Sequence, residues 1–384
     1  MHDELKQQLD KSIPQHITLT EIKKEKILQE AQKAVVYKRS SQTSKLLPAI
    51  VGAAVIGLSV LLSYPYVTEN GQFTKGSLQE VTIPDQPYPV LINAEYNNQE
   101  DILIYTDAER VYSYSVDAKT ETVLTEAEET AKISEVTTED EWVVWSELAE
   151  GSSTLWILNQ GSGEIQTIKD IYASDLNIDG SMLSYLEIGV ENETPAYKLL
   201  NLATLEEPFE HVSSGEGADS SASFEDGVLA IPERVTKDGQ TTTTVFVYNA
   251  KQQSKIGEFT FPYEAAFNVT LSDGKIFARL ADVNQSYSVL AYIDVKSGKL
   301  VEIETPEFWE YAVYENYVAL SIPEGNSNTV KLYEIEGKIV KELPALSVIE
   351  ERLVKPRFTE DGKLLVNGEG ERFSMYLQNP KDID

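Results

Sequence analysis

Residues 99–384 repeat one arrangement of polar and apolar positions: an acidic turn, an apolar strand, a polar loop, a second strand, a tight turn and a third strand. The turn-and-strand segments lie at 99–107, 139–147, 178–187, 225–233, 272–280, 314–322 and 360–368. These seven copies follow one another at intervals of about 39 to 47 residues, the period of a propeller blade with its four antiparallel strands. We predict an all-β propeller of about seven blades, with six or eight blades, or a pair of β-sandwiches, as alternatives.

The turns and strands of the repeat have local causes. Asp-Gly and Ser-Gly pairs supply the positive φ angle that a tight hairpin needs. Residues 245–248 alternate valine with an aromatic residue, the period of two expected for a strand. The last copy ends early, whereas segment 78–84 precedes the first copy as a spare strand. Since an open sheet edge invites aggregation, we predict that this segment completes the final blade.

The repeats resemble those of the TolB-like or WD40-like propeller family, in which strands often follow an Asp-Gly-Lys turn. Asp273-Gly274-Lys275 and Asp361-Gly362-Lys363 carry the resemblance. It extends over about 300 residues and implies a fold, because propellers of this kind serve many functions.

The region before the repeats contains one long apolar segment. No residue between Leu46 and Thr68 is charged, and a helix over 46–67 is long enough to cross a hydrocarbon core of about 30 Å. Basic residues gather before the segment and are sparse after it, which predicts a cytoplasmic N-terminus and an external C-terminal domain. We therefore expect a single-pass protein of the cell membrane. Ala49, Ala53 and Gly57 form a small-residue stripe through which two such helices could dimerise.

The domain boundaries follow from this reading. Residues 1–45 form a cytoplasmic tail, 46–67 the transmembrane helix, 68–77 a polar linker and 78–384 the propeller. Within the tail, Pro14 separates two short predicted helices, and Thr18 with Glu21 forms a capping box at the start of the second. The apolar residues of that helix need a partner to cover them, and we predict that they bind one; the alternative is a loosely ordered basic segment beside the membrane. They are Ile22, Ile27, Leu28, Ala31 and Val35.

The tail has a family resemblance of its own. The stretch HDELKQQLDKSIPQHITLTEIKKEKILQEAQK, followed by a basic patch and one apolar span, resembles the N-terminus of membrane-anchored anti-sigma factors of Bacillus-type bacteria. The resemblance implies that residues 1–45 hold a cytoplasmic sigma factor while the outer domain senses envelope conditions. The sequence lacks the His/Cys zinc signature of one subclass of that family.

Charge and composition exclude several classes of function. The net charge is -31, with about +3 on residues 1–45 and about -34 on the remainder. Such an acidic domain is unsuited to nucleic acid, whose phosphates need Lys and Arg. The chain has no cysteine, which excludes disulfides, thiol nucleophiles and Cys-based zinc sites. We expect no cofactor.

Catalytic candidates are few. His211 is the only histidine after the apolar span, and no Gly-x-Ser-x-Gly motif occurs. No residues remain for the separate hydrolase domain that propeller-capped peptidases carry. We therefore interpret His211 as a surface or inter-blade residue. Some carboxylate pair among the many acids could hydrolyse glycosides, but the sequence does not identify it.

Two further features allow a ligand. Asp175, Asn177 and Asp179 match the first half of a calcium loop, although position twelve is Leu186 and the Asp-Gly pair also falls on the repeated blade turn. We do not assign a metal there. The four tryptophans at 142, 145, 156 and 309 favour packing between blades over a ligand platform.

These observations favour a transmembrane signalling regulator that is not an enzyme. Its propeller would bind an envelope protein or ligand outside, and its tail would bind a regulatory protein inside. The alternatives are an external binding or assembly module without a cytoplasmic partner and an external carboxylate-dependent hydrolase.

Overall fold

The structure is a computed structural model that describes residues 78–384 except 85, 151, 189–193, 214–215, 219, 283–287, 326, 371–372 and 384. The predicted tail, transmembrane helix and linker lie outside the described residues. The same holds for the tail residues that we predict to bind a partner and for the small-residue stripe. Within the described part of the chain, no helix is long and apolar enough to span a membrane.

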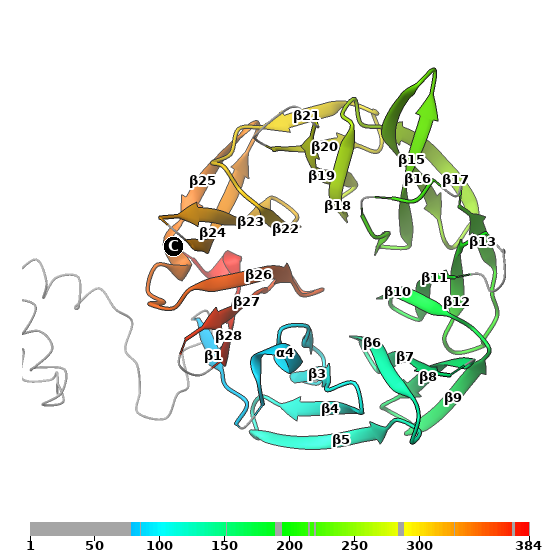
Figure 1. Ribbon diagram of the computed structural model, residues 1–384. Coiled ribbons are helices and arrows are strands. Elements are labelled where there is room, and N and C mark those ends of the chain that lie inside the picture. The colour runs from blue at the N-terminus through cyan, green and yellow to red at the C-terminus, as the bar shows by residue number, and fades with distance from the viewer. Residues whose placement is uncertain are drawn as a thin grey trace, which may run out of the picture. The chain divides into compact units, whose positions relative to one another are not determined.

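The strands form seven four-stranded antiparallel sheets that stand around a central axis as propeller blades (Figure 1). Blades 1 and 2 contain β2 (Glu95–Asn97), β3 (Ile102–Thr106), β4 (Arg110–Ser115), β5 (Thr120–Glu126), β6 (Lys132–Glu139), β7 (Trp142–Ala149), β8 (Ser152–Asn159) and β9 (Glu164–Lys169). Blades 3 and 4 contain β10 (Ala173–Asp179), β11 (Met182–Glu187), β12 (Ala196–Asn201), β13 (Phe209–Val212), β14 (Ser223–Glu225), β15 (Val228–Lys237), β16 (Gln240–Asn249) and β17 (Ser254–Thr260). Blades 5 and 6 contain β18 (Ala265–Ser272), β19 (Lys275–Ala281), β20 (Val289–Asp294), β21 (Leu300–Ile303), β22 (Glu310–Tyr314), β23 (Tyr317–Glu324), β24 (Ser327–Glu336) and β25 (Ile339–Leu343).

Blade 7 joins the two ends of the described chain. It contains β26 (Leu353–Phe358), β27 (Leu364–Glu369) and β28 (Phe373–Gln378), with β1 (Gln79–Val81) as its outermost strand. β1 lies beside β28 (Figure 1). Glu80 lies opposite Tyr376, and Val81 lies opposite Met375. The predictions of seven blades and of closure by segment 78–84 are therefore confirmed, and the alternatives of six blades, eight blades or a sandwich pair are wrong. The remaining elements of the described residues are the short helices α4 (Tyr88–Leu91), η1 (Pro344–Leu346) and η2 (Pro380–Asp382).

The apolar core is divided among the contacts between neighbouring blades. One cluster combines Trp142 and Leu155 of blade 2 with Leu183 and Leu200 of blade 3. Another joins blade 7 to blade 1, since Val81 and Met375 pack with Leu103. Each sheet thus buries apolar side chains on both faces, which is the main stabilising term of the ring.

The predicted turn chemistry is present at the hairpins between the first two strands of a blade. Asp226 and Gly227 have φ angles of 52° and 72°, and Asp273 and Gly274 have 50° and 67°. Two consecutive positive φ angles define the hairpin turn that matches the twist of the flanking strands. The alternation at residues 245–248 is also confirmed: Val245 and Val247 are fully buried in β16, whereas Phe246 and Tyr248 are half-buried against blade 3.

The tryptophans divide into two groups. Trp142 and Trp145 are buried, and Trp145 stacks on Trp156 with ring centroids 5.8 Å apart, so packing is confirmed for these three. Packing is the wrong interpretation for Trp309, whose exposed fraction is 58%. Trp309 directly precedes β22, at the start of a first strand, where it faces solvent.

Candidate binding site at the central channel

The first strand of each blade lies next to the axis, and successive first strands are neighbours (Figure 1). Along β10 the two alternating sets of side chains make different contacts. Leu176 and Ile178 pack into the core shared with blade 2, whereas Asp175 and Asp179 form hydrogen bonds to blade 4. One set therefore fills the preceding blade contact, and the other set places polar groups along the channel toward the following blade.

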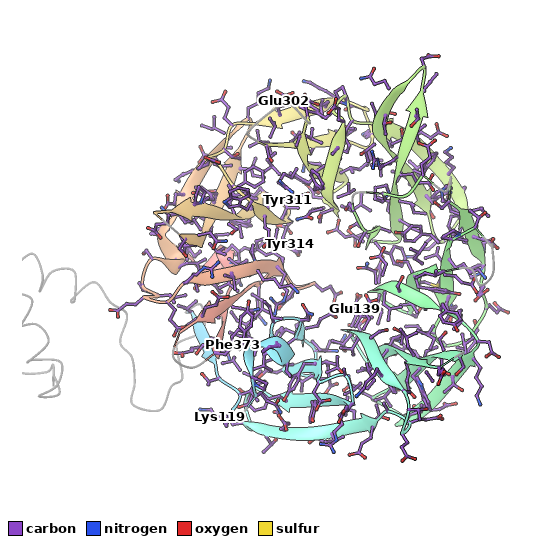
Figure 2. The ribbon with its side chains drawn as sticks, in the orientation of Figure 1. Lys119, Glu139, Glu302, Tyr311, Tyr314 and Phe373 are labelled. Carbon is purple, nitrogen blue, oxygen red and sulfur yellow. The ribbon has the colours of Figure 1, made fainter. Side chains whose placement is uncertain are left out.

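The last residue of several first strands binds the backbone of the next blade. Glu139 at the end of β6 accepts a 2.6 Å hydrogen bond from the Gly180 amide, and Asp179 accepts one from the Gly227 amide. In blade 5 the Ser272 hydroxyl accepts a 2.8 Å hydrogen bond from the Glu315 amide. We call these contacts the blade latches, defined by Glu139, Asp179 and Ser272. Figure 2 places Glu139 at the channel-facing end of β6.

Carboxylates from distant blades influence one another at this end of the channel. Burial raises the pKa of Glu139 to about 8, and the negative charges of Glu360, Asp179 and Asp140 contribute to the rise. Burial and neighbouring acids likewise raise the pKa of Glu225 to about 7. Because Glu360 follows β26 in blade 7 while Asp179 ends β10 in blade 3, the turns concentrate negative charge around the channel.

The channel also holds a buried basic group between blades 7 and 1. Arg357 donates a 2.7 Å hydrogen bond to the Ala94 carbonyl, and burial lowers the pKa of this guanidinium to about 10, partly offset by Glu95. Glu95 accepts a 3.0 Å hydrogen bond from the Thr138 amide, and burial raises its pKa to about 7. The inner strands therefore carry charged groups of both signs.

A second set of bonds lies nearer the start of the first strands. Glu135 of β6 accepts hydrogen bonds of 3.0 and 2.9 Å from the amides of Asp175 and Leu176. Asp175 has a φ angle of 55° at a bulge in β10, and its Oδ2 accepts from both the Ala222 amide and the Tyr197 hydroxyl at 2.9 Å. A bulge of this kind redirects a side chain away from the regular strand pattern.

A hollow of about 600 Å³ opens beside this bulge. It is lined by residues of blades 2 and 3 and by Ala218, Ser220 and Ser221, which precede blade 4, and we call it the blade 3–4 hollow. Its lining consists of Glu135, Ser174, Asp175, Leu186, Tyr197, Ala218, Ser220 and Ser221. Its lining combines two carboxylates, four hydroxyls and two apolar side chains, so it is a mixed polar site with an acidic character.

His211 is confirmed as an inter-blade residue. Its Nδ1 lies 2.6 Å from the Tyr248 hydroxyl and its Nε2 lies 2.9 Å from Oε1 of Glu233, across the contact between blades 3 and 4. The imidazole also packs on Phe246, with ring centroids 5.1 Å apart. Both ring nitrogens are thus engaged by side chains of blade 4.

The residues that match half of a calcium loop in the sequence form a strand in the structure. Asp175, Asn177 and Asp179 belong to β10, which is extended and paired with β11, and the adjacent Gly180 lies at the blade turn. The two carboxylates form the inter-blade bonds described above, and Asn177 donates to the Ala222 carbonyl. Among the described residues, no group of three or more His, Asp or Glu side chains is placed to hold a metal ion.

No protein-family model matches the sequence, and neither does any curated protein. Among solved structures, a chain of the mitotic checkpoint complex is similar at 10% identity, covering 83% of this chain and 99% of that one, with a TM-score of 0.54. The propeller domain of the Trilobed protease from Pyrococcus furiosus, described as having an open velcro topology, is 18% identical over 67% and 83% of the two chains, with a TM-score of 0.50.

A prolyl endopeptidase is 11% identical with a TM-score of 0.52; the match covers 87% of this chain but only 56% of that enzyme. These identities are low, between 10% and 18%. The likenesses therefore show that the described residues form a β-propeller.

Proposed function

We propose that the propeller is a binding module without catalytic activity of its own, and that it engages its ligand or partner at the start of the first strands. The observation that carries the proposal is the blade 3–4 hollow, a polar concave site beside the central channel. Concave sites with a few convergent polar groups are the usual binding sites of folded domains.

The bonding of the channel carboxylates supports a binding role over a hydrolase. Glu135, Glu139 and Asp179 all accept hydrogen bonds from backbone amides of the following blade. A carboxylate that holds two blades together is already committed to a structural task. A glycosidase, in contrast, needs one carboxylate to donate a proton and a second to act on the sugar or on water.

For the whole chain we propose a transmembrane regulator. The apolar span 46–67 tethers the propeller outside the cell, and residues 1–45 hold a cytoplasmic partner, for which the anti-sigma-like N-terminus suggests a sigma factor. A propeller-like chain in the mitotic checkpoint complex offers a precedent for this fold in a protein assembly.

The partner of the tail is tested with residues 1–45 as bait in a lysate of the native host. We expect recovery of a sigma factor, and loss of that recovery when Ile22 and Leu28 are both changed to Asp. A scrambled tail is the control. Recovery no better than this control favours an external module without a cytoplasmic partner, in which case deletion of residues 1–35 leaves function intact.

The binding face of the propeller is tested by photo-crosslinking in intact cells. A photoreactive residue at Ser221, exposed on the rim of the hollow, is expected to capture a ligand or partner. The matched position is Ser162, exposed in the turn between β8 and β9. Equal capture at both positions would contradict a binding face at the hollow.

A further inference from the structure

The blade 3–4 hollow has a size and a charge that define a class of ligand. Its volume of about 600 Å³ falls within the range of roughly 300 to 1,000 Å³ that small-molecule sites occupy. Among the described residues of its lining, the charged side chains are Glu135 and Asp175, which are both acidic. The hollow therefore favours a cationic group over an anionic one.

The environment of Glu135 strengthens this preference. Burial raises the pKa of its carboxyl group, and the nearby charge of Asp175 raises it further. Two carboxylates held close together in a partly desolvated site repel each other. A cation between them and the solvent relieves that repulsion.

The hydrogen bonds of the two carboxylates indicate which oxygen atom is available to a ligand. Both oxygens of Glu135 already accept backbone amides. At Asp175, every hydrogen bond described for the carboxylate goes to Oδ2, from Ala222 and Tyr197. The Asp175 Oδ1 atom, with the hydroxyls of Ser174 and Ser221 in the same lining, is therefore the acceptor set that a ligand meets.

We infer that the blade 3–4 hollow binds a small organic molecule through a primary ammonium group. An ammonium has three N–H donors and no acceptor, and it matches one carboxylate oxygen together with two hydroxyls. Leu186 and Ala218 supply apolar contact for a short alkyl portion of the ligand. This inference rests on the proposed function and adds to it the chemistry of the ligand.

The test measures binding of pentylamine to the full-length chain in detergent by isothermal titration calorimetry at pH 7. We expect saturable binding of pentylamine and none of pentanol, which has the same chain length without the charge. Absence of pentylamine binding, or equal binding of the alcohol, overturns the inference.

Two variants of the same strand make the test specific. Asp175→Asn keeps an oxygen acceptor and suits the left-handed φ angle, because Asn adopts that conformation readily, yet it removes the charge. We expect at least a tenfold loss of pentylamine affinity. Asp179→Asn makes the same change at the end of β10, outside the hollow, and we expect less than a twofold change. Equal losses in the two variants overturn the inference.

A third variant guards against a folding defect in Asp175→Asn. Ala218 is exposed on the rim, so Ala218→Phe is expected to block the hollow without altering the core or the charge, and to abolish pentylamine binding. Retained binding in this variant places the amine elsewhere and overturns the inference.

Two comparisons distinguish this inference from binding of a lysine side chain and from the proposed function. An N-acetylated peptide with one lysine presents the same ammonium group on a protein-like ligand; we expect weaker binding than for pentylamine, and tighter binding overturns the assignment to a small molecule. Crosslinking at Ser221 does not depend on amine chemistry. Capture at Ser221 without amine binding therefore overturns this inference alone and leaves the proposed function standing.

Discussion

At the residue scale, the blade latches explain why acidic side chains occupy the inner strands of a domain that is already strongly acidic. Glu139 accepts the Gly180 amide at 2.6 Å and in this way satisfies a donor of the next blade. A buried donor without a partner costs about 1 to 3 kcal/mol. The carboxylates at the channel therefore contribute to the ring as hydrogen-bond acceptors.

Glu139→Ala removes one latch and should lower the free energy of unfolding by about 1 to 3 kcal/mol at pH 6, because it leaves the Gly180 amide without its acceptor. Glu139→Gln retains an acceptor oxygen and should cost less than about 0.5 kcal/mol, as a substitution without such a defect does. Urea denaturation followed by circular dichroism measures both. A loss in the Gln variant as large as that in the Ala variant would show that the acceptor oxygen retained by Gln does not support this position.

The same residues predict how stability depends on pH. Burial raises the pKa of Glu139 to about 8 and that of Glu95 and Glu225 to about 7, all above the value near 4.5 of an exposed glutamate. A raised folded-state pKa means that the folded state binds more protons than the unfolded state, so stability is fully present below about pH 4.5 and is lost as the pH rises through about 7 to 8.

We expect a higher melting temperature at pH 5.5 than at pH 8.5 in thermal scans. The pKa values of Asp107 and Asp294 are lowered instead, and these groups titrate below this window. Glu139→Gln should flatten the profile, because it removes a carboxyl group whose pKa is raised to about 8. A melting temperature that increases toward pH 8.5 would contradict this assignment.

At the scale of the element, the contribution of the closing strand β1 to ring closure can be tested directly. Val81 has an exposed fraction of 4% and packs with Met375 and Leu103, so Val81→Asp places a charge in the contact between blades 7 and 1. We expect a loss of about 3 kcal/mol or more, since the variant combines lost burial with an unpaired buried charge. The free energy of unfolding in urea measures the loss.

The matched control for Val81→Asp is Val123→Asp on the outer strand β5, where the valine is 44% exposed. It makes the same chemical change at a position that is already solvated, and it should change the stability by less than about 0.5 kcal/mol. Similar losses in both variants would mean that β1 adds little to ring closure.

Some elements of the blades were predictable from the sequence, and others were not. The Asp-Gly turns and the apolar second strands were predictable, because hairpin geometry and period-two alternation are local properties. The first strands were not, because β10 carries three polar residues that match half of a calcium loop. Their bonding partners lie 41 to 48 residues away in the next blade, and only the ring brings them together. The hollow was missed for the same reason, since Glu135 and Ser221 are distant in the sequence.

At the scale of the whole molecule, the charge distribution predicts the position of the propeller relative to the membrane. Residues 1–45 carry about +3 and the residues after them about -34, with the uncharged segment 46–67 at the start of that acidic part. Basic residues beside a span remain in the cytoplasm, so the propeller should lie outside the cell. Because the chain has no cysteine, a single introduced thiol reports its own side of the membrane without background.

We expect Ser162→Cys, in the exposed turn between β8 and β9, to react with a membrane-impermeant maleimide in intact cells. Ser41→Cys, in the predicted cytoplasmic tail, should react only after the cells are lysed. The unmodified chain should remain unlabelled in both conditions. Labelling of Ser41→Cys alone in intact cells would reverse the predicted orientation, and equal accessibility of the two thiols before lysis would exclude a membrane between them. The first pattern would place the hollow outside the cell and the tail inside it, which is the arrangement a transmembrane regulator requires.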